Sequence, residues 1–112
     1  MQRTGKYGLI VARGTGDMLQ VTCEAEPFDT GDVVRFVVRT TPPDIQELLV
    51  KEISSFTDGA AIIQLTESDT LSLAAADLCY GINIIRAGQE PQALIINAPF
   101  VVVEAVARDE QP

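Results

Sequence analysis

Histidine is absent from this sequence of 112 residues. Its imidazole is the usual general base near neutral pH, and it belongs to the Ser-His-Asp triad, the Cys-His pair and most catalytic zinc sites. The absence therefore argues against the common hydrolase mechanisms. A hydrolase that uses two carboxylates is the least favoured of the hypotheses considered below, because nothing marks any two of the 16 Asp and Glu residues as a pair. No catalytic residue is predicted, and we expect a protein that is not an enzyme.

Aromatic residues are scarce, because they make up 5% of the chain and tryptophan is missing. The aromatic platforms that sugar-binding clefts usually contain are therefore nearly absent. Hydrophobic residues nevertheless reach 46%, which excludes intrinsic disorder and predicts a core of Val, Ile, Leu and Ala. The two Tyr and four Phe residues stand singly in or beside apolar segments, and core packing explains them.

Positive charge and long apolar runs are also in short supply. Eight Lys and Arg residues against 16 Asp and Glu residues leave a net charge of −8, which disfavours binding to nucleic acid or to anionic lipid. No apolar run approaches the roughly 18 residues of a membrane-spanning helix. The apolar stretch at 9–12 is too short for the core of a signal peptide. We therefore expect no nucleic-acid or membrane partner, and a chain made and kept inside a cell.

The chain contains only two cysteines, Cys23 and Cys79. Strand alternation places Cys23 on the apolar face of its segment and Cys79 on the face opposite Tyr80 and its apolar neighbours. A bond across a core needs both sulfur atoms to point inward, and a reducing compartment disfavours it further. The sequence predicts two free thiols. Two cysteines alone make a weak metal site, and no metal or other cofactor is predicted.

Polar turns offer only weak binding signals. Residues 14–17, Gly-Thr-Gly-Asp, lack the third glycine and the lysine of a phosphate-binding loop, so a plain turn is expected. The acidic pairs Asp29 with Asp32 and Glu67 with Asp69 offer carboxylate oxygens for weak calcium binding. Neither pair belongs to a full ligand loop, and solvated turn residues are the favoured interpretation.

The strongest structural pattern lies at residues 76–84, where apolar side chains recur at every second position. This period is typical of a strand with one buried face. A turn at 87–89 then joins it to apolar segments at 92–96 and 100–103, which predicts a hairpin. Upstream, the turn-forming pair Asp58-Gly59 predicts a second hairpin that joins residues 53–56 to residues 61–65. The two hairpins together predict a meander.

Further strands are predicted at residues 7–12, 18–25 and 33–39. The segment at 45–53 is ambiguous. We favour a short helical turn at 44–48 followed by a strand, and a helix through Ile53 is the alternative. Thr66 is placed to begin a single helical turn. These seven or eight strands, separated by turns and without a long helix, predict an antiparallel β-sandwich. The chain reads as one domain, residues 1–112, with a polar tail from about residue 108.

Several segments occur in the order found in one protein family. They are Gly31-Asp32 at the start of a strand, the Asp58-Gly59 turn, the run Leu65-Thr66-Glu67-Ser68-Asp69-Thr70, the Tyr80 segment at 73–84, and Pro99-Phe100-Val101-Val102. In this the chain resembles the immunoglobulin-like domains of phage tail and baseplate proteins, such as the N-terminal domain of upper-baseplate proteins and small prophage-encoded relatives. It departs from that pattern at Ala74-Ala75-Ala76 and at Gly81. The resemblance implies an immunoglobulin-like sandwich and a structural part of a virion tail, assembled in the bacterial cytoplasm. It implies no catalytic residue.

Some strands carry more apolar residues than one buried face requires. A lone sandwich needs one apolar face per strand, so the surplus side chains indicate a partner surface. The candidate interface residues are Val33, Val37, Ile95, Val101 and Val103. A second copy of the chain, or another phage structural protein, is the expected partner.

Two functional hypotheses follow. The first is a non-enzymatic structural or assembly module that oligomerises or docks to neighbouring tail proteins. The alternative is a small ligand-binding module, such as a carbohydrate-binding or adhesion domain, which predicts a concave site with convergent polar groups.

Overall fold

The computed structural model describes residues 2–5, 7–23, 26–40 and 46–104. Within these ranges the protein is mostly β, with seven strands of five or more residues in sheets of five and two. The three-residue strand β1 extends the edge of the larger sheet. In chain order the elements are β1 (Gln2–Thr4), β2 (Gly8–Ala12), β3 (Asp17–Val21), β4 (Val33–Thr40), β5 (Glu47–Ile53), β6 (Ala61–Leu65), α1 (Glu67–Leu71), β7 (Ala76–Ile85) and β8 (Gln92–Val103).

The larger sheet has the strand order β1-β2-β8-β7-β4-β5, and the smaller sheet pairs β3 with β6. All pairs are antiparallel except β2 with β8, which run parallel with Leu9 opposite Phe100. The larger sheet is therefore mixed, and the prediction of an antiparallel sandwich is wrong for this pair. Tight turns oblige successive strands to run antiparallel, but β2 and β8 are far apart in the chain and no such turn constrains them.

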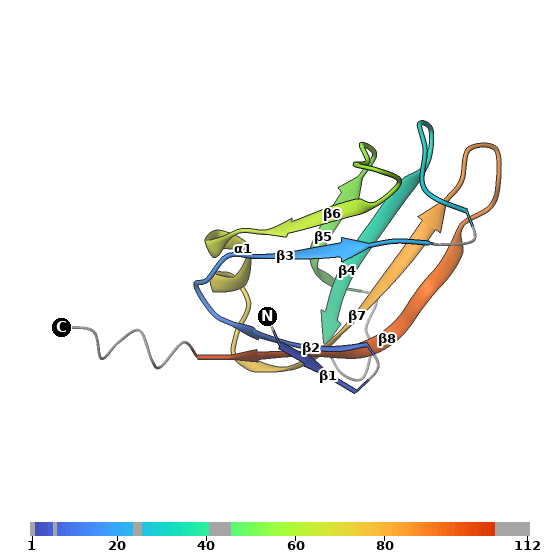
Figure 1. The fold of residues 1–112 in the computed structure, drawn as a ribbon. Coiled ribbons are helices and arrows are strands. Elements are labelled where there is room, and N and C mark those ends of the chain that lie inside the picture. The colour runs from blue at the N-terminus through green and yellow to red at the C-terminus, as the bar shows by residue number, and fades with distance from the viewer. Residues whose placement is uncertain (1, 6, 24–25, 41–45, 105–112) are drawn as a thin grey trace.

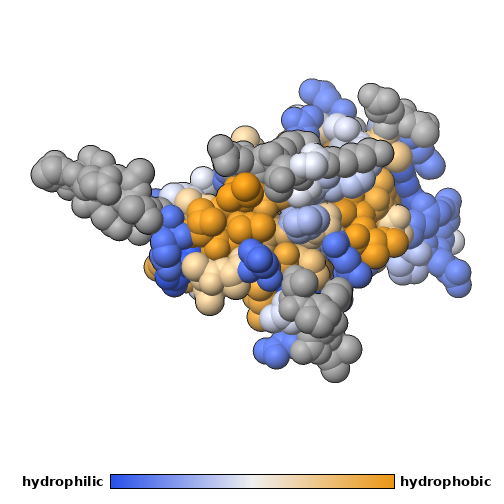
Figure 2. All heavy atoms as spheres, turned by 90° about the horizontal axis from the view of Figure 1, so that it is seen from below, coloured by the Kyte–Doolittle hydropathy of each residue, from blue (hydrophilic) through white to orange (hydrophobic). Residues whose placement is uncertain are grey.

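The two sheets form two layers, with β3 and β6 lying over one face of the larger sheet (Figure 1). No described helix or strand lies over the opposite face, which we call the outer face. Figure 2 views the molecule from the side of β1, β2 and β8, and shows apolar atoms spread across it between scattered polar residues.

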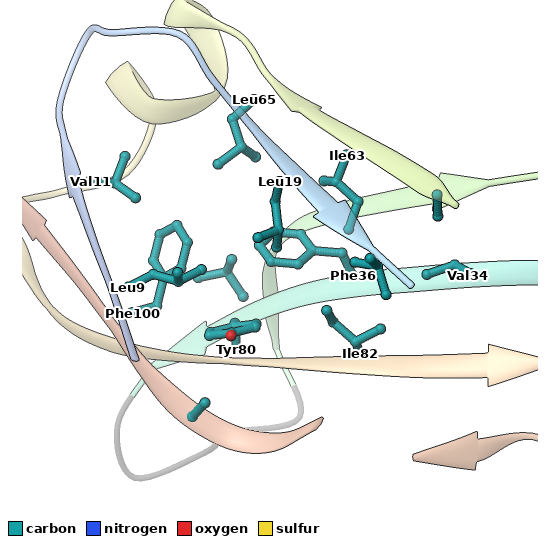
Figure 3. Packing of buried hydrophobic residues seen from close by; sticks show 14 of the residues in the cluster. Leu9, Val11, Leu19, Val34, Phe36, Ile63, Leu65, Tyr80, Ile82 and Phe100 are labelled. Carbon is teal, nitrogen blue, oxygen red and sulfur yellow. The ribbon is translucent and has the colours of Figure 1, made fainter. Parts of the chain in front are cut away.

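The core lies between the layers and draws side chains from both sheets (Figure 3). Phe36, Tyr80 and Phe100 form its aromatic centre, with ring centroids 5.5 to 6.0 Å apart. Leu19 and Ile63 from the smaller sheet point toward these rings. The alternation predicted for β7 is confirmed, because Tyr80 and its alternate neighbours are buried while the intervening positions from Gly81 onward are half-buried.

The Asp58-Gly59 turn forms, but the predicted hairpin does not. Asp58 and Gly59 adopt φ values of 52° and 77°, and Thr57 pairs with Ala60 in an isolated bridge. Beyond that bridge the chain leaves one sheet for the other, because β5 pairs with β4 and β6 pairs with β3. The meander is therefore wrong at this point, whereas the β7–β8 hairpin is confirmed. Turn chemistry sets the reversal of the chain, and it does not choose the sheet that the next strand joins.

The ambiguous segment is strand β5 from Glu47 onward, so the helix through Ile53 is wrong. Leu49 and Ile53 pack against the core from one face of the strand, and Lys51 between them reaches Asp69 at 2.7 Å. The expected helical turn at 44–48 is not formed at 47–48, and its first two residues lie outside the described ranges.

Helix α1 begins where the sequence predicts. Thr66 caps it by accepting a hydrogen bond from the Asp69 amide, and the Asp69 carboxylate accepts one from the Thr66 amide. This reciprocal pair satisfies two N–H groups at the start of the helix. Thr70 is fully buried, and its hydroxyl donates to the Thr15 carbonyl at 2.8 Å, which ties the helix to the turn before β3.

Strand β8 is longer and less regular than predicted. It continues through Pro99 as a single element of 12 residues. Its register with β7 shifts twice, between Tyr80 and Ile82 and between Ile82 and Asn83, and Asn97 has a φ of 49°. These irregularities are β-bulges, which bend the strand and redirect its side chains.

Candidate functional site

The outer face is the surface on which the candidate interface residues were predicted to lie. On β4 the core residues alternate with the outer residues Val33, Arg35, Val37 and Arg39. The register places Val37 between Val50 of β5 and Gly81 of β7.

The five candidate residues differ in exposure. Val103 is 40% exposed, and Val33 and Val101 are half-buried. Ile95 is half-buried because it packs against the core cluster. Val37 is only 3% exposed although it lies on the outer face, so as packed it offers no surface to a partner.

Ion pairs on the outer face account for the burial of Val37. The Glu47 carboxylate forms ion pairs with Arg35 at 2.9 Å and with Arg39 at 3.2 Å. These two arginines lie two positions before and two positions after Val37 on β4. Arg35 also reaches Glu52 at 3.2 Å. The hydrogen bond from Arg35, followed by the charges of both arginines, holds the pKa of Glu47 below its ordinary value despite partial desolvation. The long side chains thus close over the valine.

The candidate residues do not form one patch. Val101 lies opposite Ile10 and Val103 opposite Ala12, so both belong to the end of the sheet near β2. Leu9 and Val11 are buried in the core, so alternation turns Ile10 and Ala12 to the outer face. We call these four residues, Ile10, Ala12, Val101 and Val103, the β2–β8 patch. Val33 pairs with Ile85 farther along the sheet.

A hollow of about 250 Å³ lies in the middle of the outer face and was not predicted. We call it the outer hollow. It opens beside Gly81, which has no side chain to fill it. Its lining residues are Val37, Arg39, Gly81, Asn83, Ala93, Ile95, Ile96 and Asn97. Alternation along β7 would have placed Gly81 and Asn83 on this face, but the bulged course of β8 that adds Asn97 has no local signal in the sequence.

A second opening of about 260 Å³ lies between the layers, beside the edge of β3. Its walls are polar and apolar in equal measure, and they include Leu19, Val21, Tyr80 and Ile82 together with Gln20 and Thr22. It is an extension of the core toward solvent at the place where the smaller sheet ends.

Two of the four acidic turn residues form ion pairs with protein groups, whereas Asp29 and Glu67 are exposed, as expected for solvated turn residues. Asp32 and Arg86 are each 7% exposed and form an ion pair at 2.9 Å, so the interpretation of Asp32 as a solvated turn residue is wrong. Asp69 is occupied by Thr66 and Lys51. Within the described ranges, no three Cys, Asp or Glu residues come together in a way that could hold a metal ion.

The two cysteines are free thiols, as predicted. Cys23 is half-buried beside the core, and Cys79 is buried on the other side of β7, where its thiol donates to the Thr40 carbonyl at 3.4 Å. In the part of the chain that the structure describes, no helix is both long and apolar enough to span a membrane.

Comparison with known proteins adds no relative. The sequence matches no protein-family model, and it matches no curated protein.

Proposed function

We propose that this chain is a non-enzymatic assembly module with an immunoglobulin-like fold, which associates through the β2–β8 patch with a second copy of itself. The setting that the sequence resemblance suggests is a phage or prophage tail or baseplate, where the copies would dock to one another or to neighbouring tail proteins.

The strand order supports the immunoglobulin-like part of the proposal. In that fold, strands B and E pair in one sheet, while G, F, C and C′ are successive neighbours in the other. Here six consecutive strands, β3 to β8, divide in the same way, with β3 beside β6 and the order β8-β7-β4-β5 opposite them. This topology requires β5 to pair in the larger sheet, so that β3 and β6 alone form the smaller one.

The observation that carries the assembly role is the apolar β2–β8 patch on a face that no described element covers. Val103 is 40% exposed and its three neighbours in the patch are half-buried, although none of them contributes to the core. Continuous apolar surface on a small domain is typical of a contact surface.

The rim of the patch favours a second copy as the partner. Arg13 and Glu104, the residues that follow β2 and β8, form an ion pair at 3.3 Å and both reach solvent. A rim that carries both signs of charge is self-complementary when two copies meet around a two-fold axis. A strongly acidic chain with no such basic group would instead repel its own copy.

Sedimentation analysis of the full chain over a range of concentrations tests the proposal. We expect a reversible oligomer that Val103→Lys shifts to monomer, because a desolvated ammonium opposes burial of the patch. Met18→Lys is the matched control, since Met18 is 56% exposed on β3 in the other layer. A wild-type chain that stays monomeric at high concentration would contradict self-association, as would an equal effect of the two substitutions.

The alternative of a ligand-binding module rests on the outer hollow, where polar and apolar side chains converge. None of its lining residues is aromatic, so it offers no ring on which a sugar could stack. Saturable binding on a glycan array would favour a carbohydrate-binding module over an assembly module.

A further inference from the structure

We propose that the outer hollow is a binding site for a small aliphatic carboxylate. The site is separate from the β2–β8 patch, and the inference does not depend on self-association. Its basis is a concave surface with an apolar wall and three side chains that keep N–H donors without an acceptor among the described residues.

Arg39 is the first of these side chains. Among the residues that the structure describes, only one of its five N–H groups has an acceptor, through Nη2 to the Glu47 carboxylate at 3.2 Å. Its Nε is buried without a partner in that part of the chain. A buried donor without an acceptor is costly, and native proteins usually pair such a group with protein or with ordered water. Most of the Arg39 donors are thus left for an acceptor from outside the described residues.

Asn83 and Asn97 are the other two side chains with N–H donors that lack an acceptor among the described residues. Neither side-chain amide has a hydrogen-bond partner among the described residues, and both line the hollow with Arg39. They come from different strands, β7 and β8, and the bulge at Asn97 is what brings the second amide to the hollow. Each amide can donate two hydrogen bonds.

This set of donors favours a carboxylate. A guanidinium and two amide NH2 groups present many N–H donors and one positive charge, and a carboxylate accepts from such donors through two oxygens with charge-assisted bonds. Glu47 already offsets part of the charge of Arg39, but it uses only one N–H group.

The remaining walls indicate an aliphatic body of few carbon atoms. Ala93 and Ile96 give the hollow its apolar side chains, and Ile96 is 73% exposed. Ile95 also lines the hollow, but its side chain packs against the core. A volume of about 250 Å³ is below the range of drug-sized pockets, so a ligand the size of a branched short-chain acid fits best.

Nuclear magnetic resonance titration of the ¹⁵N-labelled full chain with isovalerate tests this site, with isovaleramide as a neutral probe of the same shape. We expect saturable shifts of the Gly81, Asn83 and Asn97 amide signals with the acid and not with the amide. Equal responses to the two probes, or shifts that do not saturate, would overturn the proposal.

A matched pair of arginine variants separates binding from stability. Arg39→Gln and Arg35→Gln each remove an ion pair with Glu47, but only Arg39 lines the hollow. We expect Arg39→Gln to weaken isovalerate binding about tenfold or more, as loss of a charge-assisted bond does, and Arg35→Gln to leave it nearly unchanged. The site is wrong if the two variants bind equally well.

Two more variants keep the test decisive if the Arg39→Gln chain misfolds. Asn83→Ala keeps both arginines and should weaken binding, whereas unchanged binding would remove Asn83 from the site. Titration of the Val103→Lys chain should match that of the wild type, because the patch is elsewhere. If the wild type alone binds the acid, the carboxylate lies between copies and not in the hollow.

Discussion

At the scale of single residues, Asp32 has an ion-pair partner that is distant in the sequence and that no local sequence pattern predicts. Its carboxylate accepts from Arg86 at 2.9 Å and from the Asp29 and Ala87 amides at 3.0 and 3.2 Å. Arg86 lies 54 positions away in the chain and also stacks over Phe28, 5.0 Å from the ring centroid. The Asp29 amide, followed by the Ala87 amide and Arg86, lowers the pKa of Asp32, and desolvation opposes the shift. The pair joins the loop before β4 to the end of β7.

The first prediction concerns the acid dependence of stability. Because the folded pKa of Asp32 is lowered, its contribution is complete above the unfolded value of about 3.9 and is lost as the pH falls through the folded value. We expect Asp32→Asn to unfold at lower urea concentration than the wild type at neutral pH. We also expect it to lose less stability than the wild type on acidification below about pH 4.

Urea unfolding at a series of pH values measures both effects. Glu90→Gln is the control, because Glu90 is exposed and makes no hydrogen bond or ion pair among the described residues. It should keep the wild-type acid dependence. Identical acid dependence of Asp32→Asn and the wild type would show that ionisation of Asp32 does not stabilise the fold.

At the scale of elements, the turns show what local chemistry decides. Gly59 lies between β5 and β6 and Gly88 between β7 and β8, with φ values of 77° and 73°. L-residues resist this region at a cost of about 1 to 2 kcal/mol. The two glycines have nearly the same backbone conformation but different surroundings. A Cβ at Gly59 would lie 2.7 Å from the Pro27 Cβ, whereas one at Gly88 would meet nothing within 4 Å.

The second prediction compares alanine at these two turns. Gly88→Ala should lower the free energy of unfolding by about 1 to 2 kcal/mol, which is the backbone cost alone. Gly59→Ala should cost more, because Pro27 must move as well. Chemical denaturation of both variants measures the difference. Equal losses would mean that the Pro27 loop yields without cost, and that the contact does not hold the β5–β6 turn in place.

At the scale of the whole molecule, the two sheets depend on one shared core. The cluster of buried residues includes Leu19 and Ile63 from the smaller sheet together with Phe36, Tyr80 and Phe100 from the larger one. A two-stranded sheet is marginal by itself, so β3 and β6 gain their stability from this packing. Such sharing predicts a single cooperative domain.

The third prediction follows from that sharing. Phe36→Ala should lower the free energy of unfolding by about 3 to 5 kcal/mol, because the ring is fully buried and contacts two other aromatic rings. Leu65→Ala in the smaller sheet should cost about 2 to 5 kcal/mol. In each variant, far-ultraviolet circular dichroism and tyrosine fluorescence should report one coincident transition. Ile96→Ala is the exposed control and should stay within about 0.5 kcal/mol. Separate transitions would show that the sheets unfold independently.

The candidate site was only partly predictable. The sequence placed Val101 and Val103 outside the core, and the structure agrees, with Val103 exposed. It also placed Val37 on the outer face, but not under the ion pairs of Glu47, because those depend on how β5 pairs with β4. The outer hollow was missed altogether, since it needs Gly81 of β7 to face a bulge in β8.

The sequence by itself determined the β class, most strand positions, the Thr66 helix cap, the reversal at Asp58-Gly59 and the free thiols. Each of these follows from residues within a few positions of one another, through side-chain alternation, backbone preference or capping. Only the tertiary structure decided the parallel pairing of β2 with β8, the assignment of β5 and β6 to different sheets, and the Asp32–Arg86 pair. These depend on contacts between distant segments, whose geometry is set by the packing of the whole core and not by any local preference.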